Sequence, residues 1–205
     1  FAETSHEVRI HAGLEQWINL SVSTNSLRAN VYLAEENITF PPTVTSLREN
    51  CFISNKMLKS VIVDAMDTLG KDCFVQCVNL TSFVIRQELK RIGIGALAYT
   101  GLIEINLSNT ISIGVRAFES CTYIKKISIG NKVERIDGYA FNSCFALRAV
   151  IISATTPPTA GAELLQNSSR AYIYVPDESV EAYKTATNWS TYADRIKPLS
   201  EYVES

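Results

Sequence analysis

The 205-residue sequence has few of the features that mark a membrane or metal protein. Its longest apolar runs, such as SVIV and AVII, are strand-sized, whereas a helix that spans a bilayer needs about 20 apolar residues. The sequence has no C-x-x-C pair, and its two histidines, His6 and His11, lie far along the chain from all five cysteines. The common zinc motifs are therefore absent, and we expect no membrane insertion, no metal and no other cofactor.

A strong charge of one sign is also missing. Nineteen Lys and Arg residues oppose 21 Asp and Glu residues, which gives a formal net charge of −2. A basic field of the kind that nucleic acid selects is absent, so we expect no nucleic-acid partner. We interpret the local basic residues Lys125, Lys126, Lys132 and Arg135 as solvated turns, with binding of an acidic polysaccharide as the alternative.

What the sequence does contain is a repeat of about 22 residues. An aromatic or leucine marker returns at intervals of 22, 23, 21 and 23 residues, at Phe52, Phe74, Leu97, Phe118 and Phe141. An aliphatic residue stands five positions before each marker, and Cys or Ala stands immediately before it. Each marker is followed by the spacing L-x-x-L-x-L, so five copies keep one register.

The spacing within a copy predicts its local structure. The last two apolar residues of L-x-x-L-x-L alternate with outward residues, which is the period-two pattern of a strand with one buried face. The marker segment A-F-x-x-C-x-x-L has the apolar stripe of a short helical turn. Neither piece can bury its inner face alone, so we expect the copies to stack about 4.8 Å apart into a solenoid, with one strand and one helical turn per repeat.

The ends of the array differ from its middle, as repeat proteins require. We expect a non-repeating N-terminal segment or cap at 1–37, the array at 38–176 and a C-terminal cap at 177–205. A degraded sixth copy is predicted with its marker at Leu164. In the cap, apolar residues from Val180 to Ile196 recur at roughly helical spacing, and Asp177 is expected to cap the first helical turn.

Two copies, VERIDGYAFNSCFALRAVII and TISIGVRAFESCTYIKKISI, resemble the BspA-like leucine-rich repeats of bacterial surface proteins. The closing segment, IYVPDESVEAYKTATNWSTYADRIKPL, also looks like the C-terminal end common among such proteins from gut and oral anaerobes. The resemblance covers residues 38–199, although the third copy, ALAYTGL, is one residue short. It implies a leucine-rich repeat solenoid, secretion or surface display, and binding or adhesion to a host or bacterial surface protein or glycan. It supplies no catalytic residues and no named ligand.

The five cysteines occupy two positions of the repeat. Cys77, Cys121 and Cys144 follow a marker by three residues, and Cys51 and Cys73 precede a marker where other copies have alanine. We interpret them as small packing residues. Two alternatives stay open. An exported protein can form the disulfides Cys121–Cys144 and Cys51–Cys73 between neighbouring copies, and a thiol can act as a nucleophile, although neither histidine lies inside the array to serve as its base.

The outward strand positions supply the candidate binding residues. Only Glu104 is acidic among them, whereas glycoside hydrolysis usually needs two carboxylates, so we expect Glu104 to pair with Lys126 across neighbouring strands. This face is apolar in several copies and ends in two tyrosines, which suit binding surfaces for proteins and sugars. The alternative is that the C-terminal cap folds over the tyrosines. The candidate ligand contacts are Ile151, Tyr172, Tyr174, Glu104, Asn106 and Lys126.

Together, the repeat and the resemblance predict a non-enzymatic binding module that is secreted or displayed on a bacterial surface, with the outward strand face as its working surface. Two other functions stay open, a passive spacer that displays another domain and an accessory domain of a carbohydrate-acting protein. The chain starts at Phe1 without a basic stretch and an apolar core, so we expect any signal peptide to have been removed. The oligomeric state and the anchor are not predicted.

Overall fold

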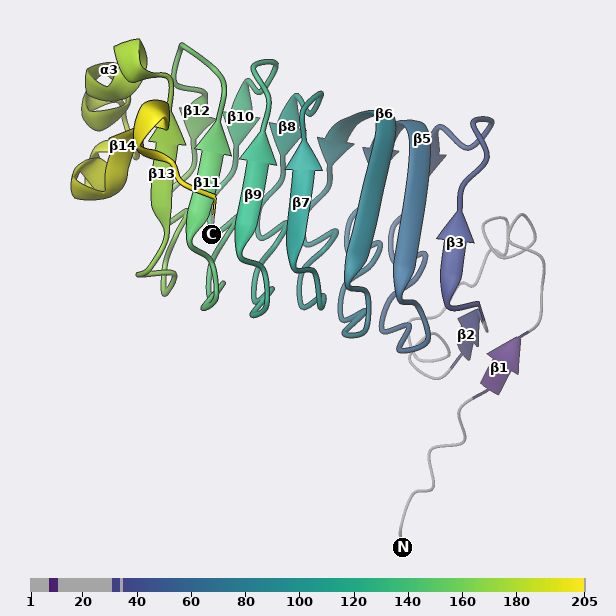
Figure 1. Cartoon of the computed structure of the whole chain (residues 1–205). Helices are drawn as coiled ribbons and strands as arrows, with labels where there is room; N and C mark the ends of the chain where they lie inside the picture. The colour runs from purple at the N-terminus through teal and green to yellow at the C-terminus, as the bar shows by residue number, and fades with distance from the viewer. Residues whose placement is uncertain (1–7, 11–30, 34, 205) are drawn as a thin grey trace, which may run out of the picture.

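The computed structural model describes residues 8–10, 31–33 and 35–204, and residues 37–198 form one stack of parallel strands (Figure 1). One wall of the stack contains five hydrogen-bonded strands, which are β7 (Glu104–Leu107), β9 (Lys126–Ile129), β11 (Ala149–Ile152), β13 (Tyr172–Val175) and β14 (Ile196–Pro198). The second wall contains β4 (Ser46–Leu47), β8 (Ser112–Ile113), β10 (Arg135–Ile136) and β12 (Thr159–Ala160). The predicted solenoid is confirmed.

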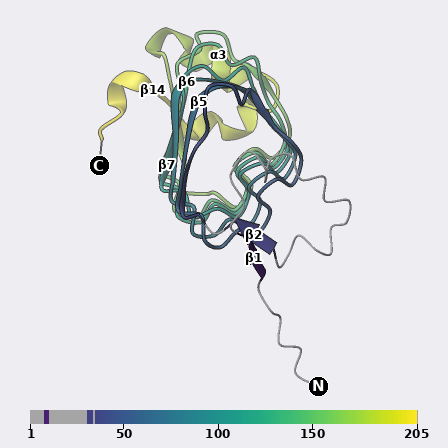
Figure 2. The same cartoon turned by 90° about the vertical axis from the view of Figure 1, so that its right-hand side faces the viewer.

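Two long strands connect the walls. β5 (Ser60–Leu69) and β6 (Ser82–Ile92) first run beside β3 (Asn37–Thr39) in line with the first wall, and then bend into the second. The bend coincides with a register shift between Val63 and Ala65, because an extra residue in one strand increases its local curvature. Seen along the stack, the turns superimpose into a closed loop around the core (Figure 2). We call the outward side of β3, β5, β6, β7, β9, β11 and β13 the strand face.

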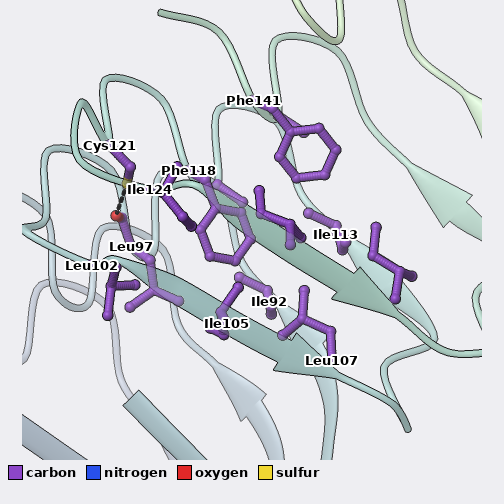
Figure 3. Packing of buried hydrophobic residues seen from close by; sticks show 14 of the residues in the cluster. Ile92, Leu97, Leu102, Ile105, Leu107, Ile113, Phe118, Cys121, Ile124 and Phe141 are labelled. Carbon is purple, nitrogen blue, oxygen red and sulfur yellow. Dashed lines mark hydrogen bonds between the residues drawn. The ribbon is translucent and has the colours of Figure 1, made fainter. Parts of the chain in front are cut away.

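The apolar spacing of the repeat accounts for the core. Of the fifteen apolar positions in the five L-x-x-L-x-L segments, only Ile85 is not fully buried. The markers Phe52 and Phe74 stack with ring centroids 5.1 Å apart, and Phe118 and Phe141 lie 5.9 Å apart (Figure 3). Because each turn contributes the same inward residues, the core is continuous from one turn to the next.

The marker segment forms a chain of tight turns in place of the short helical turn expected from its spacing. The residues two before and two after each marker have positive φ, for example Arg116 (57°) and Ser120 (56°) around Phe118, and such residues interrupt a helix. The backbone N–H groups of these three residues donate to the carbonyls of Gly138, Ala140 and Asn142 on the next turn. The N–H groups of Ala117 and Glu119 donate within the turn, to the carbonyls of Gly114 and Arg116. Successive N–H groups of this segment therefore alternate between bonds to the next turn and bonds within their own turn.

The sixth copy has its marker at Leu165, so the prediction of Leu164 was wrong by one residue. Glu163 and Asn167 have positive φ, two residues before and after Leu165, and the N–H of Phe141 donates to the Leu164 carbonyl as other markers donate to the residue before the next marker. The displacement arises in the proline-containing loop before β12, where Ile136 pairs with Ala160 at a spacing of 24 residues.

The C-terminal cap is short and closes the end of the stack. It contains η1 (Asp177–Ser179), α3 (Val180–Thr185) and η2 (Ser190–Arg195), followed by the last strand, β14, and η3 (Leu199–Glu201). Tyr183 and Trp189 are buried, and their hydroxyl and indole N–H donate to the carbonyls of Ala154 and Pro158. The expectation that Asp177 caps the helix was wrong, because its Oδ1 accepts the Ser200 N–H at 3.0 Å and no side-chain cap bond forms at η1 or α3.

The predicted N-terminal segment lies largely outside the described residues. Within it, β1 (Val8–Ile10) pairs in parallel with β2 (Val31–Leu33), and the register joins Val8 to Val31 at a spacing of 23 residues, as in the array. In the described part of the chain, no helix is both long and apolar enough to cross a membrane.

Candidate functional site

The strand face is interrupted between β6 and β7. Within residues 35–204 every other pair of neighbouring turns on this wall is joined by a strand ladder, but β6 and β7 belong to different sheets. The interruption falls where the third copy is one residue short, since Leu102 follows Leu97 by five residues and Leu147 follows Phe141 by six. The shorter corner changes where β7 begins, and the regular register is lost.

A groove of about 550 Å³ opens on the strand face at this interruption. Val84 of β6 and Ile103, just before β7, are 45% and 48% exposed in it. The polar side of the groove is lined by Ser82, Glu104, Asn106, Lys126 and Ser128. Cα atoms of β6 and β7 still lie within 8 Å of each other, whereas an inserted strand would need them about 9.6 Å apart. The groove therefore suits side chains that approach from outside.

Lys126 is the charged centre of this region. Its Nζ lies 3.3 Å from a carboxylate oxygen of Glu104 and 2.7 Å from one of Glu204. The hydrogen bond to Glu204, together with that to Glu104, raises the pKa of Lys126, and the same ammonium group lowers the pKa of Glu204. One cation with two carboxylates leaves a net charge of −1, and Glu104 is mostly exposed.

The segment 199–204, which we call the strap, crosses the other half of the strand face. It leaves β14, passes outside the wall of strands and ends in front of β11 (Figures 1 and 2). The Tyr202 ring meets the Tyr174 ring edge to face with centroids 5.0 Å apart, and Glu204 reaches Lys126. The strap thus covers part of β13 and ends at the groove.

The six predicted contact residues fall into two places. Glu104, Asn106 and Lys126 lie together in the groove, and the predicted Glu104–Lys126 pair is confirmed. Tyr172 is 45% exposed, whereas Tyr174 and Ile151 are half-buried, Tyr174 against the strap. The cap therefore covers one of the two tyrosines. Ala149, which the alternation of the strand places outward, is only 4% exposed.

Sequence reasoning missed Ile103. It stands where neighbouring copies have Lys125 and Arg148, so an apolar residue at a basic position of the repeat was the available signal. The shortened third copy was a second signal, because it marks the place where the ladder breaks.

The cysteines that follow a marker have a role that their size alone did not reveal. Cys121 Sγ donates to the Leu97 carbonyl at 3.1 Å (Figure 3), and Cys144 Sγ donates to the Phe118 carbonyl at the same distance. Ser168 makes the equivalent bond to Phe141 at 2.7 Å. Burial raises the pKa of Cys121 to about 11 and that of Cys77 to about 12, so these thiols stay protonated. They are structural donors, which disfavours the nucleophile alternative.

Comparisons with known proteins agree with the repeat architecture. The family model of the BspA type leucine rich repeat region matches residues 16–125 and 98–187 in six copies. The solved structure of a leucine-rich repeat protein from T. pallidum is similar, with a TM-score of 0.61, 17% identity and coverage of 70% of each chain. No curated protein matches.

Two further solved structures are aligned with lower TM-scores. A leucine-rich cell surface protein from Faecalibacterium prausnitzii has 13% identity and a TM-score of 0.29, with coverage of 79% of this chain and 78% of that one. The pneumococcal vaccine antigen PcpA has 10% identity and a TM-score of 0.31, with coverage of 86% and 80%.

Proposed function

The chain belongs to the BspA-type leucine-rich repeat family, and from this premise we propose that it is a non-enzymatic binding module of a bacterial cell surface, with the β6–β7 groove as its principal contact site. Repeat domains of this kind generally act by binding. The observation that carries the proposal is the pair of exposed aliphatic side chains, Val84 and Ile103, at the one interruption of the ladder on the described strand face.

The groove favours a protein ligand over a glycan. Sugar rings pack best on aromatic faces, whereas the exposed apolar residues of the groove are the aliphatic Val84 and Ile103. Aliphatic side chains of a partner fit between them, and buried apolar contacts of this kind form the centre of protein interfaces. The exposed Tyr172 at the other half of the face is the better platform for a sugar.

The charges favour a partner that carries a basic residue. Lys126 is already paired with two carboxylates, and Glu104 keeps a mostly exposed carboxylate at the edge of the groove. An arginine or lysine of the partner gains a charged hydrogen bond to Glu104 while its aliphatic stem packs on Ile103. An apolar protein segment that contains one basic side chain is therefore the ligand class that we propose.

The test is an array of extracellular matrix proteins, bacterial surface proteins and glycans, probed with the native chain and two variants. Ile103→Asp places a charge in the groove, and Ile94→Asp is the matched control, because Ile94 is 49% exposed but lies in a turn outside the groove. We expect a protein target whose binding falls at least tenfold in Ile103→Asp and is unchanged in Ile94→Asp. Binding that both variants retain places the site elsewhere, and an array without any target indicates a spacer.

A further inference from the structure

Two cysteines outside the groove lie on adjacent turns at the N-terminal end of the array. Cys51 and Cys73 each occupy the position immediately before a marker, and the next three copies have Ala96, Ala117 and Ala140 there. Alanine is sufficient for packing at this position. The two cysteines therefore supply a chemical property that the fold does not require.

The hydrogen bonds between turns place these residues opposite each other. The N–H of Phe52 donates to the Cys73 carbonyl at 2.7 Å, and the N–H of Asn50 donates to the Lys71 carbonyl at 2.8 Å, so Cys51 has Cys73 as its neighbour in the stack. Parallel strands lie about 4.8 Å apart, which is within the range of about 4.4–6.8 Å that a disulfide tolerates between Cα atoms. Burial raises the pKa of the Cys73 thiol, and so does a side-chain hydrogen bond with Cys51; both residues are thiols.

The other neighbouring thiols are held differently. Cys121 and Cys144 also lie on adjacent turns, but each Sγ is directed to a carbonyl of the preceding turn, at 3.1 Å in both cases. Both residues are buried, as is Cys73, whereas Cys51 is half-buried and so within reach of a small oxidant. Only the Cys51–Cys73 pair combines contact between the thiols with access from solvent.

We propose that Cys51 and Cys73 are a redox-sensitive pair that closes to a disulfide between the first two turns when the protein meets an oxidising disulfide. The Cys51 thiolate attacks one sulfur of oxidised glutathione and releases one glutathione thiolate. The released glutathione thiolate takes the proton of the Cys73 thiol, and the Cys73 thiolate then attacks Cys51 in the mixed disulfide and releases the second glutathione as a thiolate, which takes up a proton. The two cysteines lose two electrons and two protons, and the glutathione disulfide becomes two thiols. This inference is independent of the binding function.

The consequence is a covalent lock at the N-terminal end of the array. The bond closes a loop of about 22 residues. It reduces the conformational entropy of the unfolded chain and so stabilises the folded state. In the reduced state the first two turns are held by hydrogen bonds and packing alone, so this end opens more readily. We expect the oxidised protein to melt roughly 6–12 °C higher than the reduced protein.

The experiment starts with the full chain in reduced form, incubates it with oxidised glutathione and maps the products by tryptic mass spectrometry. The expected product links peptide 49–56, which contains Cys51, to peptide 72–86, which contains Cys73 and Cys77. Fragmentation between Phe74 and Gln76 assigns the bond to Cys73 or Cys77. Three thiols, those of Cys77, Cys121 and Cys144, should remain and should react with a thiol reagent only after the protein is unfolded.

Two variants complete the test. Cys51→Ala copies the residue of three other turns and should abolish the link and the rise in melting temperature. Cys77→Ser keeps a hydrogen-bond donor, as Ser168 does in the sixth copy, and should leave both unchanged. A bond to Cys77, a bond between Cys121 and Cys144, a stable glutathione adduct on Cys51 or five thiols after prolonged oxidation would each overturn the proposal.

Discussion

The two halves of the strand face are built from the same repeat but present different surfaces. The half around β6 and β7 is interrupted, hollow and open, with Val84 and Ile103 exposed. The half from β9 to β13 has an unbroken ladder and is partly covered by the strap through Tyr202 and Glu204. A repeat therefore fixes the scaffold, whereas local departures from it create the places where a ligand can bind.

The buried core is built from the same repeat positions beneath both halves of the strand face. We therefore expect substitutions in the core to have the largest effect on the free energy of unfolding. Phe118→Ala removes a fully buried ring that packs against Phe141, and we expect a loss of about 3–5 kcal/mol in the free energy of unfolding. Chemical denaturation measures it. Phe118→Leu is the control, because Leu97 occupies the same position in the third copy, and a loss of similar size for both variants would contradict a packing role.

The interruption predicts a local difference in amide exchange. The Ile103 carbonyl accepts the Lys125 N–H, so the alternate residues Glu104 and Asn106 direct their N–H groups toward β6, where no ladder receives them. Their amides should exchange at least roughly two orders of magnitude faster than those of Lys126 and Ser128. Hydrogen exchange followed by NMR tests this, and equal protection in β7 and β9 would remove the distinction between the two halves.

The buried thiols test the bonds between turns beneath the covered half. Cys144→Ala loses the bond from Sγ to the Phe118 carbonyl and leaves a small void, so we expect a loss of about 1–2 kcal/mol in the free energy of unfolding. Cys144→Ser should lose less, because a hydroxyl can donate to the same carbonyl, as Ser168 does to Phe141. Thermal and urea unfolding of both variants provide the comparison, and a greater loss for Ser than for Ala would show that polarity is not tolerated there.

The strap can be opened without disturbing the core. Tyr202→Ala removes the edge-to-face contact with Tyr174, which we expect to cost at most about 1 kcal/mol. The Tyr174 ring should then become more accessible and its NMR signals should shift. Leu199→Ala is the control, since Leu199 lies in the same segment and is already exposed. If Tyr174 is unchanged in Tyr202→Ala, the strap does not cover this half of the face.

Acid should loosen the end of the strap. Lys126 holds the pKa of Glu204 below its ordinary value of 4.5. The ion pair therefore stabilises the strap at pH values above the ordinary pKa of Glu204, and this contribution is lost as the pH falls through the lowered pKa. The Val203 amide should exchange faster as the pH is lowered from about 5 to about 3, after correction for the intrinsic rate. In Glu204→Gln this additional change should be absent.

Several features of the fold and of the site were predictable from the places that particular residues take in the repeat. The spacing of the apolar positions identified the turns, their inward residues and the Glu104–Lys126 pair, because side chains at equivalent positions of a stack must be neighbours. The short third copy indicated an irregular array but did not show that a groove forms there. Ile103 and the one-residue displacement to Leu165 depend on how the chain turns a corner, which a linear spacing does not determine.

The sequence by itself determined the solenoid, its period and its core, since a periodic apolar pattern has one way to bury all copies at once. The tertiary structure alone decided which part of the strand face is open. Tyr202 and Glu204 lie 28 and 78 residues along the chain from Tyr174 and Lys126, and contacts over such distances depend on the path of the cap. The tertiary structure also revealed that the thiols of Cys121 and Cys144 donate to carbonyls of the preceding turn. The sequence did not predict these bonds, because they depend on the direction of the side chain and not on its size.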